Sequence, residues 1–332
     1  MKNSLRLDPQ ITSRIVLVLV LFVLFSVFES SFATAANIYT VLEGFAFTGL
    51  VALAIGITII AGEMDLSVGS MAAVAGVIAV SFAGLGLIFA VLLAVLVTAA
   101  LGALQGVAIG LLRIPSIVFT VGTMIWLRGL VYILSGENTV VVPDLKMVEV
   151  IRHPVSVFSL FSLITIGMFI LMGLFMNYSR SGRNVYAIGG GRMQAAAAGV
   201  PVFRTIVLIF TVSGILAGLA GSLVCLKSGS AIPHGLEGLL LLAAAAALIG
   251  GTTLSGGRGT VLGIALGAMT IRFVSSYINF KAMPYYAENL AIGALLILII
   301  AIELLVAKPG RTAHGTHGLT RRAKQSAVHW EP

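Results

Sequence analysis

Charged residues are scarce in this chain of 332 residues: Asp, Glu, Lys and Arg make up 10% of it, whereas 59% is hydrophobic. Soluble globular domains usually carry about 25% charged residues. This composition excludes a soluble fold, because it cannot supply a water-exposed surface. The net charge of +8 does not indicate nucleic acid, since the basic residues lie between long apolar runs instead of clustering on one face.

Cysteine and the common catalytic motifs are equally scarce. The single cysteine, Cys225, excludes an intrachain disulfide, so cysteine chemistry does not indicate the compartment. The chain has no Gly-Lys dipeptide, hence no phosphate-binding loop, and no H-E-x-x-H zinc motif or G-x-S-x-G nucleophile elbow. His314 and His317 supply only two possible ligands, which do not close a metal site. We therefore predict a protein that is not an enzyme and binds no metal or cofactor.

Long apolar segments fill most of the chain. A helix needs about 20 mostly apolar residues to cross the hydrocarbon core of a bilayer. We interpret ten segments as spans: Arg14–Thr34, Val41–Gly62, Ser67–Leu85, Leu87–Leu112, Ser116–Ser135, Val157–Tyr178, Thr205–Lys227, Glu237–Thr252, Thr260–Phe280 and Tyr286–Ala307. The third and eighth are alternatively re-entrant or partly buried elements. The predicted fold class is all-α and polytopic, with about ten transmembrane helices.

We predict one transmembrane domain over the whole chain, divided into a cytoplasmic segment 1–13, a membrane core 14–307 and a cytoplasmic polar tail 308–332. The first span follows basic residues and precedes Ala33-Thr34-Ala35, which is also typical of a cleavable signal peptide. Because many spans follow, we expect the first span to be retained.

The distribution of basic residues orients the spans. With both termini cytoplasmic, 14 of the 20 Lys and Arg residues lie on the inner side, as the positive-inside rule requires. They are Lys2, Arg6, Arg14, Arg113, Arg180, Arg183, Arg192, Arg204, Arg258, Lys308, Arg311, Arg321, Arg322 and Lys324. We therefore predict cytoplasmic termini.

Two spans carry glycines at every fourth position: Gly102, Gly106 and Gly110 in one, and Gly259, Gly263 and Gly267 at the start of the other. This spacing puts the glycines on one helix face, where a neighbouring backbone can approach closely. We favour ordinary helix packing over a mobile pathway lining as its explanation.

The segment Gly62–Ser70, with the sequence GEMDLSVGS, separates the second and third spans. Two carboxylates beside apolar helices are costly unless they are solvated or paired. Asp65 or Ser67 is positioned to cap the following helix, and Gly69 permits close backbone contact. The segment is either a capped turn at the membrane face or a broken helix whose ends face a solute, as in many transporters. We call Gly62–Ser70 the gating turn; its candidate functional residues are Asp65, Ser67, Gly69 and Ser70.

The segment Tyr178–Arg204 is the only long basic loop inside the membrane core. Its alanine run, preceded by glycines and closed by Gly199 and Pro201, predicts a short helix at the membrane face. It is either an ordinary linker or a docking site for a cytoplasmic partner, and docking explains its small side chains better. We call Gly189–Val200 the coupling segment. Its candidate docking residues are Gly189, Gly190, Gly191, Arg192, Gln194, Ala195, Ala196 and Gly199.

A third segment, Gly250–Gly259, has five glycines between the eighth and ninth spans, which predicts a tight turn. We call it the glycine turn.

In this order, the three segments resemble the ribose/galactose/xylose-type permease subunits of bacterial ABC importers. That family has a G-[IL]-D-L-S-V-G-S-like motif, a G-R-x-x-x-A-I-G-G loop and a glycine-rich turn at these places. The resemblance extends over about residues 40–305 and includes the stretch from Ile114 to Gly129, where Thr120, Thr123 and Arg128 are candidate pathway residues. Glu63-Met64 stands where the family usually has Gly-Ile, and Gly191 where it commonly has Asn.

The resemblance implies a type II-like ABC importer permease fold in the bacterial inner membrane. It implies two cytoplasmic ATPase subunits, which hydrolyse the ATP, a second permease chain in a homo- or heterodimer, and a periplasmic binding protein. The expected function is to form the translocation pathway for a sugar or sugar-like solute.

Two alternatives stay open. One is an importer of another small polar solute, such as a nucleoside, an autoinducer or a branched-chain amino acid. The other is an ion-coupled secondary transporter, which needs intramembrane acids; the candidates are Glu43, Glu237, Glu288 and Glu303.

The predicted orientation is testable by cysteine labelling from the two sides of the membrane. Ser326→Cys should react only from the cytoplasm and Ser156→Cys only from the periplasm, because 14 basic residues hold the termini inside. Labelling of Ser326→Cys from the periplasm would refute the ten-span topology.

Overall fold

The computed structural model describes residues 9–154, 156–236 and 238–306. The chain divides into one compact unit up to Ile292 and a second unit from Gly293. The N-terminal residues Lys2 and Arg6 and the tail 308–332, with its basic residues and both histidines, lie outside the described residues.

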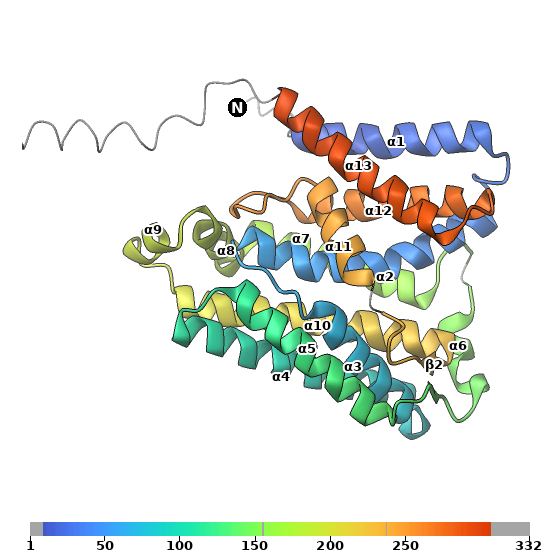
Figure 1. The fold of residues 1–332 in the computed structure, drawn as a ribbon, viewed down its shortest axis with the longest axis horizontal. Helices are drawn as coiled ribbons and strands as arrows, with labels where there is room; N and C mark the ends of the chain where they lie inside the picture. The colour runs from blue at the N-terminus through green and yellow to red at the C-terminus, as the bar shows by residue number, and fades with distance from the viewer. Residues whose placement is uncertain (1–8, 155, 237, 307–332) are drawn as a thin grey trace, which may run out of the picture. The chain divides into compact units, whose positions relative to one another are not determined.

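Helices account for most of the described structure (Figure 1). Seven are long and apolar enough to cross a membrane: α1 (Pro9–Phe28), α2 (Ala35–Ile60), α4 (Leu87–Leu112), α5 (Ser116–Ser135), α7 (Leu160–Tyr178), α10 (Val202–Ser228) and α12 (Val261–Phe280). The other helices are α3 (Val68–Ser81), α6 (Glu149–Arg152), α8 (Arg180–Gly190), α9 (Arg192–Ala197), α11 (Leu239–Ile249) and α13 (Tyr285–Val306), with the 3-10 helices η1 (Ala83–Leu85) and η2 (Leu145–Val148).

All ten predicted spans correspond to helices, so the polytopic α-helical fold is confirmed. Two predicted spans are shorter than expected. The third ends at Ser81, before η1, and the eighth occupies only Leu239–Ile249. At 1.5 Å per residue, helices of 14 and 11 residues extend only about 21 and 17 Å, less than the roughly 30 Å hydrocarbon core.

The first predicted span is also displaced. We expected Arg14–Thr34, but α1 runs from Pro9 to Phe28, and Thr34 instead caps α2 by accepting a hydrogen bond from the Asn37 backbone N–H.

A pair of short β-strands was also not expected in an all-α fold. The two-residue strands β1 (Val140–Val141) and β2 (Ser230–Ala231) pair antiparallel, with Val140 opposite Ala231.

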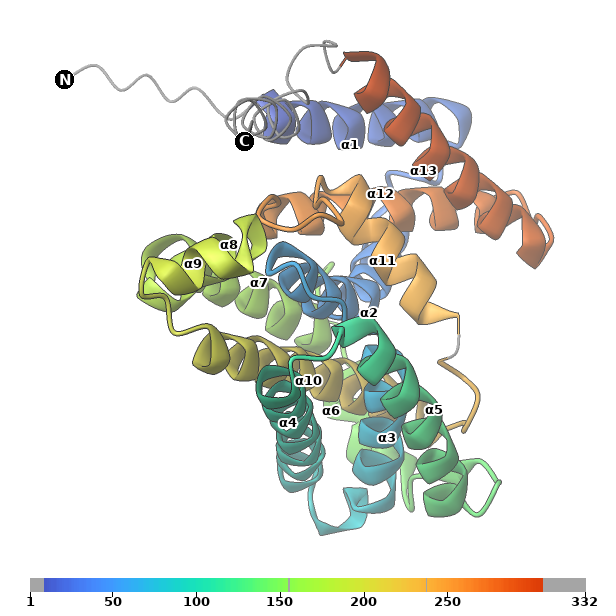
Figure 2. The same cartoon turned by 60° about the vertical axis from the view of Figure 1, so that its left-hand side comes forward.

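The core of the larger unit is built around α2, α3 and α10. Helix α3 packs against α10, α4 and α5, and α10 also packs against α4 and α2; Figure 2 shows α3, α4 and α5 as neighbours. Twelve of the 14 residues of α3 are buried. The short broken helix is therefore enclosed by longer helices.

Glycines bring the backbones of α4 and α10 into contact. A Cβ atom on Gly102 would collide with the Phe210 carbonyl, and one on Gly106 would lie 2.6 Å from the Val207 Cα. From the other side, a Cβ on Gly214 would collide with the Thr98 carbonyl. In the same way, Gly267 of α12 packs against Ala246 of α11, and Gly263 packs against Gly250, which caps α11, whereas Gly259 lies before α12. The repeated glycines therefore serve close helix packing, as their spacing predicts.

The basic loop contains more helix than predicted. The short helix expected from the alanine run is α9, but α8 precedes it and was not predicted. Ser179 caps α8 by accepting a hydrogen bond of 2.8 Å from the Gly182 N–H. Val185 and Ile188 of α8 are buried. Apolar residues three positions apart are typical of an amphipathic helix, so the sequence contained a signal for α8.

The α4–α10 contact generates a stability prediction. Gly106→Ala should lower the free energy of unfolding by about 1–3 kcal/mol, because overpacking forces the backbones apart. Gly167→Ala in α7 is the matched control, since a Cβ there meets nothing within 4 Å. Thermal unfolding of the purified protein measures both. Equal effects of the two changes would contradict tight α4–α10 packing.

Candidate functional site

A buried carboxylate organises the gating turn. Asp65 is fully buried and accepts hydrogen bonds from the Ser67 backbone N–H at 3.0 Å and from the Ser67 hydroxyl at 2.6 Å. Ser67 occupies the N-cap position of α3, but its side chain makes no capping hydrogen bond. Of the two alternatives, Asp65 or Ser67, the Ser67 side chain does not cap the helix: its hydroxyl is turned to Asp65, which holds this N-cap residue directly before α3.

Two side chains from other helices complete this network. Ser213 in α10 donates to the second oxygen of Asp65 at 2.7 Å, and Gln105 in α4 donates to the Ser67 hydroxyl at 2.9 Å. All four side chains are buried. Sequence analysis missed Gln105 and Ser213. Their signal was present, because a polar side chain inside an apolar helix needs a partner.

The first turns of α5 hold the backbone of the gating turn. The Met64 N–H donates to the Ser116 hydroxyl at 3.0 Å, and the Leu66 N–H donates to the Thr120 hydroxyl at 3.2 Å. Thr120 in turn donates to the Met64 carbonyl at 3.1 Å. Ser116 and Thr120 are four residues apart and so share one face of α5. The structure therefore brings predicted residue Thr120 to the gating turn, together with Ser116, which was not predicted.

The remaining candidates near this segment are placed differently. Thr123 donates to the Phe119 carbonyl in its own helix at 3.0 Å. Arg128, farther along α5, donates to the Pro233 carbonyl at 3.3 Å and is half-buried. Gly69 and Ser70 lie buried in the first turn of α3. Thr123 and Arg128 are therefore not brought into the Asp65 network.

The three segments singled out in the sequence meet at one end of the helices. The Gly257 N–H donates to the Ile60 carbonyl at 2.8 Å. A Cβ on Gly189 would collide with that carbonyl, and a Cβ on Gly256 would lie 2.7 Å from the Gly62 Cα. Gly62, Gly256 and Gly257 all have positive φ, which side chains disfavour. We call this contact of three backbones the glycine junction.

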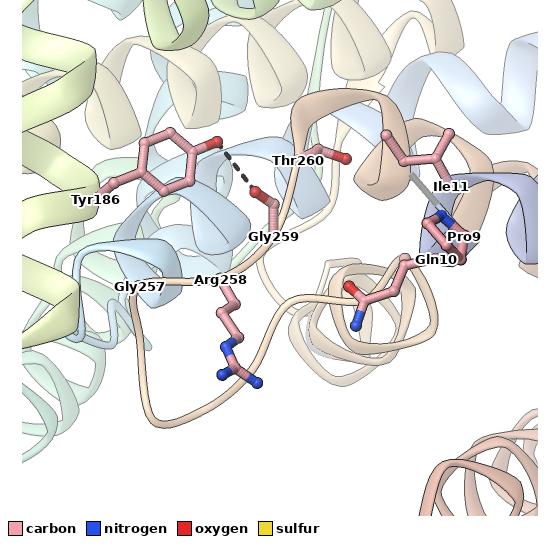
Figure 3. A pocket seen from close by; sticks show the side chains of 10 residues that line it. Pro9, Gln10, Ile11, Tyr186, Gly257, Arg258, Gly259 and Thr260 are labelled. Carbon is pink, nitrogen blue, oxygen red and sulfur yellow. Dashed lines mark hydrogen bonds between the residues drawn. The ribbon is translucent and has the colours of Figure 1, made fainter. Parts of the chain in front are cut away.

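Tyr186 of α8 ties the same end together. Its hydroxyl donates to the Gly259 carbonyl at 3.0 Å (Figure 3), and burial raises the pKa of the Tyr186 phenol, which keeps it a donor. A cavity of about 460 Å³ opens beside this bond, lined by the glycine turn and by residues 9–11 of α1. Arg258 points away from Tyr186 there (Figure 3). Among the described residues, none of the gating turn lines this cavity, so the two are separate.

An ion pair joins the coupling segment to the gating turn. The Arg192 Nη1 lies 3.3 Å from the Glu63 Oε1. Burial raises the pKa of the Glu63 carboxyl, while its hydrogen bond with Ser116 and the positive charge of Arg192 offset part of that rise. Neither the pair nor the role of Glu63 was predicted, because the two residues are 129 positions apart.

The outer face of the coupling segment carries both long and small side chains. Met193 and Gln194 are exposed, as are Ala196, Ala197 and Ala198, whereas Ala195 is buried. Gly191 precedes α9, and Gly199, with a φ of 81°, follows it. No described atom outside its immediate neighbours would meet a Cβ on Gly190. This surface is therefore exposed and available for contact.

The acids that an ion-coupled transporter would need are engaged in other contacts where they are described. Glu43 forms an ion pair with Lys227 and accepts a hydrogen bond from Ser159. Glu288 accepts a hydrogen bond from Ser275. Glu237 and the side chain of Glu303 lie outside the described residues.

The fold and this site define a polytopic helical transport permease. Residues 37–300 match the family described as "Branched-chain amino acid transport system / permease component", and the chain belongs to that family.

Curated relatives from Escherichia coli K12 align over most of their length. The ribose import permease protein RbsC is 27% identical over 87% of this chain and 92% of its own. The D-allose transport system permease protein AlsC is 30% identical, covering 83% and 86%, and the L-arabinose transport system permease protein AraH is 30% identical, covering 88% and 90%. No solved structure gives a significant match to the chain.

The Asp65 network predicts a graded response to substitution. Asp65→Ala should destabilise the protein strongly, because each buried donor that loses its acceptor costs about 1–3 kcal/mol. Asp65→Asn should be milder, since the amide oxygen still accepts from Ser67. Membrane abundance and thermal unfolding measure the difference.

Asp144→Ala is the matched control. Asp144 makes the same type of turn, accepting from the Lys146 N–H at 2.9 Å, but it is exposed, so water replaces the lost acceptor. If Asp65→Asn were as damaging as Asp65→Ala, the charge itself, rather than its acceptor oxygens, would be required.

Proposed function

We propose that this chain is the membrane-spanning subunit of an ATP-driven importer for a monosaccharide or a similar polar solute. The printed names of three relatives specify ribose, D-allose and L-arabinose. Each aligns over more than four fifths of this chain. The function is therefore proposed from relatives that align over most of this chain.

One observation carries the mechanism. The exposed coupling segment, which contains α9, contacts the gating turn through the glycine junction and through the Arg192–Glu63 pair. The gating turn is in turn hydrogen-bonded to α5. The chain has no phosphate-binding loop. We infer that a cytoplasmic ATPase subunit docks on the coupling segment and that its movement reaches α5 along this connection. Two ATPase subunits would serve two permease chains, a homo- or heterodimer.

The orientation follows from charge. The described arginines at positions 113, 180, 183, 192, 204 and 258 lie at helix ends or loops on the side of the glycine junction. By the positive-inside rule this end faces the cytoplasm and the β1–β2 ribbon faces the periplasm. Both termini are then cytoplasmic in a bacterial inner membrane.

A separate periplasmic binding protein would select the solute. On α5, the proposed pathway helix, the polar side chains Thr123 and Arg128 are only half-buried and widely spaced. Passage is fast when the pathway binds its solute weakly. High affinity is therefore expected in the binding protein rather than in this chain.

A branched-chain amino acid is the second candidate solute, because the family description names that class. Identifying the ligand on the co-purified binding protein decides between the two. ATP-dependent uptake into vesicles without an ion gradient tests the transport class. Uptake driven by an ion gradient without ATP would refute the proposal.

The docking surface is testable with one bulky residue. Ala196→Trp should abolish co-purification of the ATPase subunit while membrane abundance stays normal, because Ala196 is exposed and the indole would fill the contact surface. Ala36→Trp is the matched control, an exposed alanine in the first turn of α2 at the opposite end. Retained assembly and transport in Ala196→Trp would exclude α9 as the docking helix and make the glycine turn the next candidate.

A further inference from the structure

Two polar groups that are distant in sequence form the side-chain contact between the coupling segment and the gating turn. Arg192 is the first residue of α9, and its guanidinium reaches Glu63 at 3.3 Å. The Arg192 side chain is 37% exposed, whereas the Glu63 side chain is only 9% exposed. The pair thus runs from the accessible surface into the packed end of α2.

Glu63 is held on its other side. Its backbone N–H donates to the Thr58 carbonyl at 3.0 Å, which closes the last turn of α2. The next three residues are bonded to Ser116 and Thr120 of α5 and to the Asp65 network. A displacement that carries the Glu63 backbone with it therefore moves the first turns of α5 or breaks these bonds.

We propose that the Arg192–Glu63 ion pair is the link that transmits movement of α9 to the gating turn and α5, with both side chains acting as positioning residues. This rests on the proposed function, in which an ATPase subunit moves α9. A pair with one nearly buried partner suits this task, because charges attract more strongly where water is excluded. An exposed pair would contribute little.

The competing route is the glycine junction, where Gly189 touches the Ile60 carbonyl and Gly257 through backbone atoms alone. That route transmits displacement by direct backbone contact and needs no charge. The two routes differ in their response to charge reversal: reversing the charge of Arg192 breaks the ion pair and leaves the three backbones unchanged.

The experiment uses the reconstituted complex of this chain with its ATPase and second permease subunits. A spin label on Gly129→Cys reports on α5, since that position is exposed and a Cβ there meets nothing within 4 Å. The native Cys225 is buried and is replaced by alanine. The signal is the change in the label's spectrum on adding ATP with orthovanadate.

Arg192→Glu should reduce the ATP-dependent change about fivefold or more, the lower end of typical coupling factors. If the loss came from a docking contact of Arg192, it would persist in a double variant that keeps this change, whereas a broken ion pair can be restored. The double variant Glu63→Lys with Arg192→Glu should restore the ATP-dependent change. Lys281→Glu is the matched control, because Lys281 pairs with Glu29 at 3.1 Å with a similar exposure of 39%. It should leave the change intact.

A full ATP-dependent change in Arg192→Glu would overturn the inference, as would failure of the double variant to restore it at normal membrane abundance. If either charge reversal lowers abundance, Arg192→Gln and Glu63→Gln decide instead: each removes one charge of the pair and should reduce the ATP-dependent change, and a full change in both would overturn the inference. Failure of the proposed function is distinguishable: the unsubstituted chain would then retain no ATPase subunit.

Discussion

The buried Asp65 carboxylate is the constraint on which the centre of this protein depends. A charge among apolar helices is costly unless hydrogen bonds compensate it. Here compensation comes from Ser67 in the gating turn and from Ser213 in α10, with Gln105 of α4 bonded to Ser67 in turn. The requirement to satisfy one carboxylate therefore fixes the start of α3 relative to two long helices.

Hydrogen bonds to the gating turn also explain why α3, which is too short to span the membrane, can lie in the core. The backbone before α3 has left the helical pattern, so its N–H and C=O groups need partners where water is excluded. Ser116 and Thr120 of α5 supply them. An unwound segment is tolerated here because neighbouring side chains satisfy it, and it thereby joins α5 to the end of α2.

Glycine sets the distances at which these groups meet. On the α4–α10 face a Cβ would collide with a facing backbone, and at the glycine junction three chain segments approach closely. Such contacts are stiff, because little side-chain volume is available to absorb a displacement. Close packing around a hydrogen-bonded break suits the proposed transmission of movement between α9 and α5.

The local sequence determined the helices. Apolar runs of about 20 residues predict spans, and all ten segments are helical; every-fourth glycines predicted close contacts, and the alanine run predicted α9. Local pattern also singled out the gating turn, the coupling segment and the glycine turn. The misplaced limits of the first, third and eighth spans arose because hydropathy does not register helix caps, such as Thr34 before α2, Phe82 after α3 and Gly250 after α11.

Only the tertiary structure decided which of these residues meet. Glu63 and Arg192 are 129 positions apart, and Asp65 and Ser213 are 148 apart. Polar groups in an apolar interior must find partners, but hydropathy does not specify which helix provides them, because many polar residues along the chain are chemically equivalent donors. The close approach of α4 and α10 brings Gln105 and Ser213 to the gating turn, and the glycine junction brings Arg192 to Glu63. These contacts together connect the surface of α9 to α5.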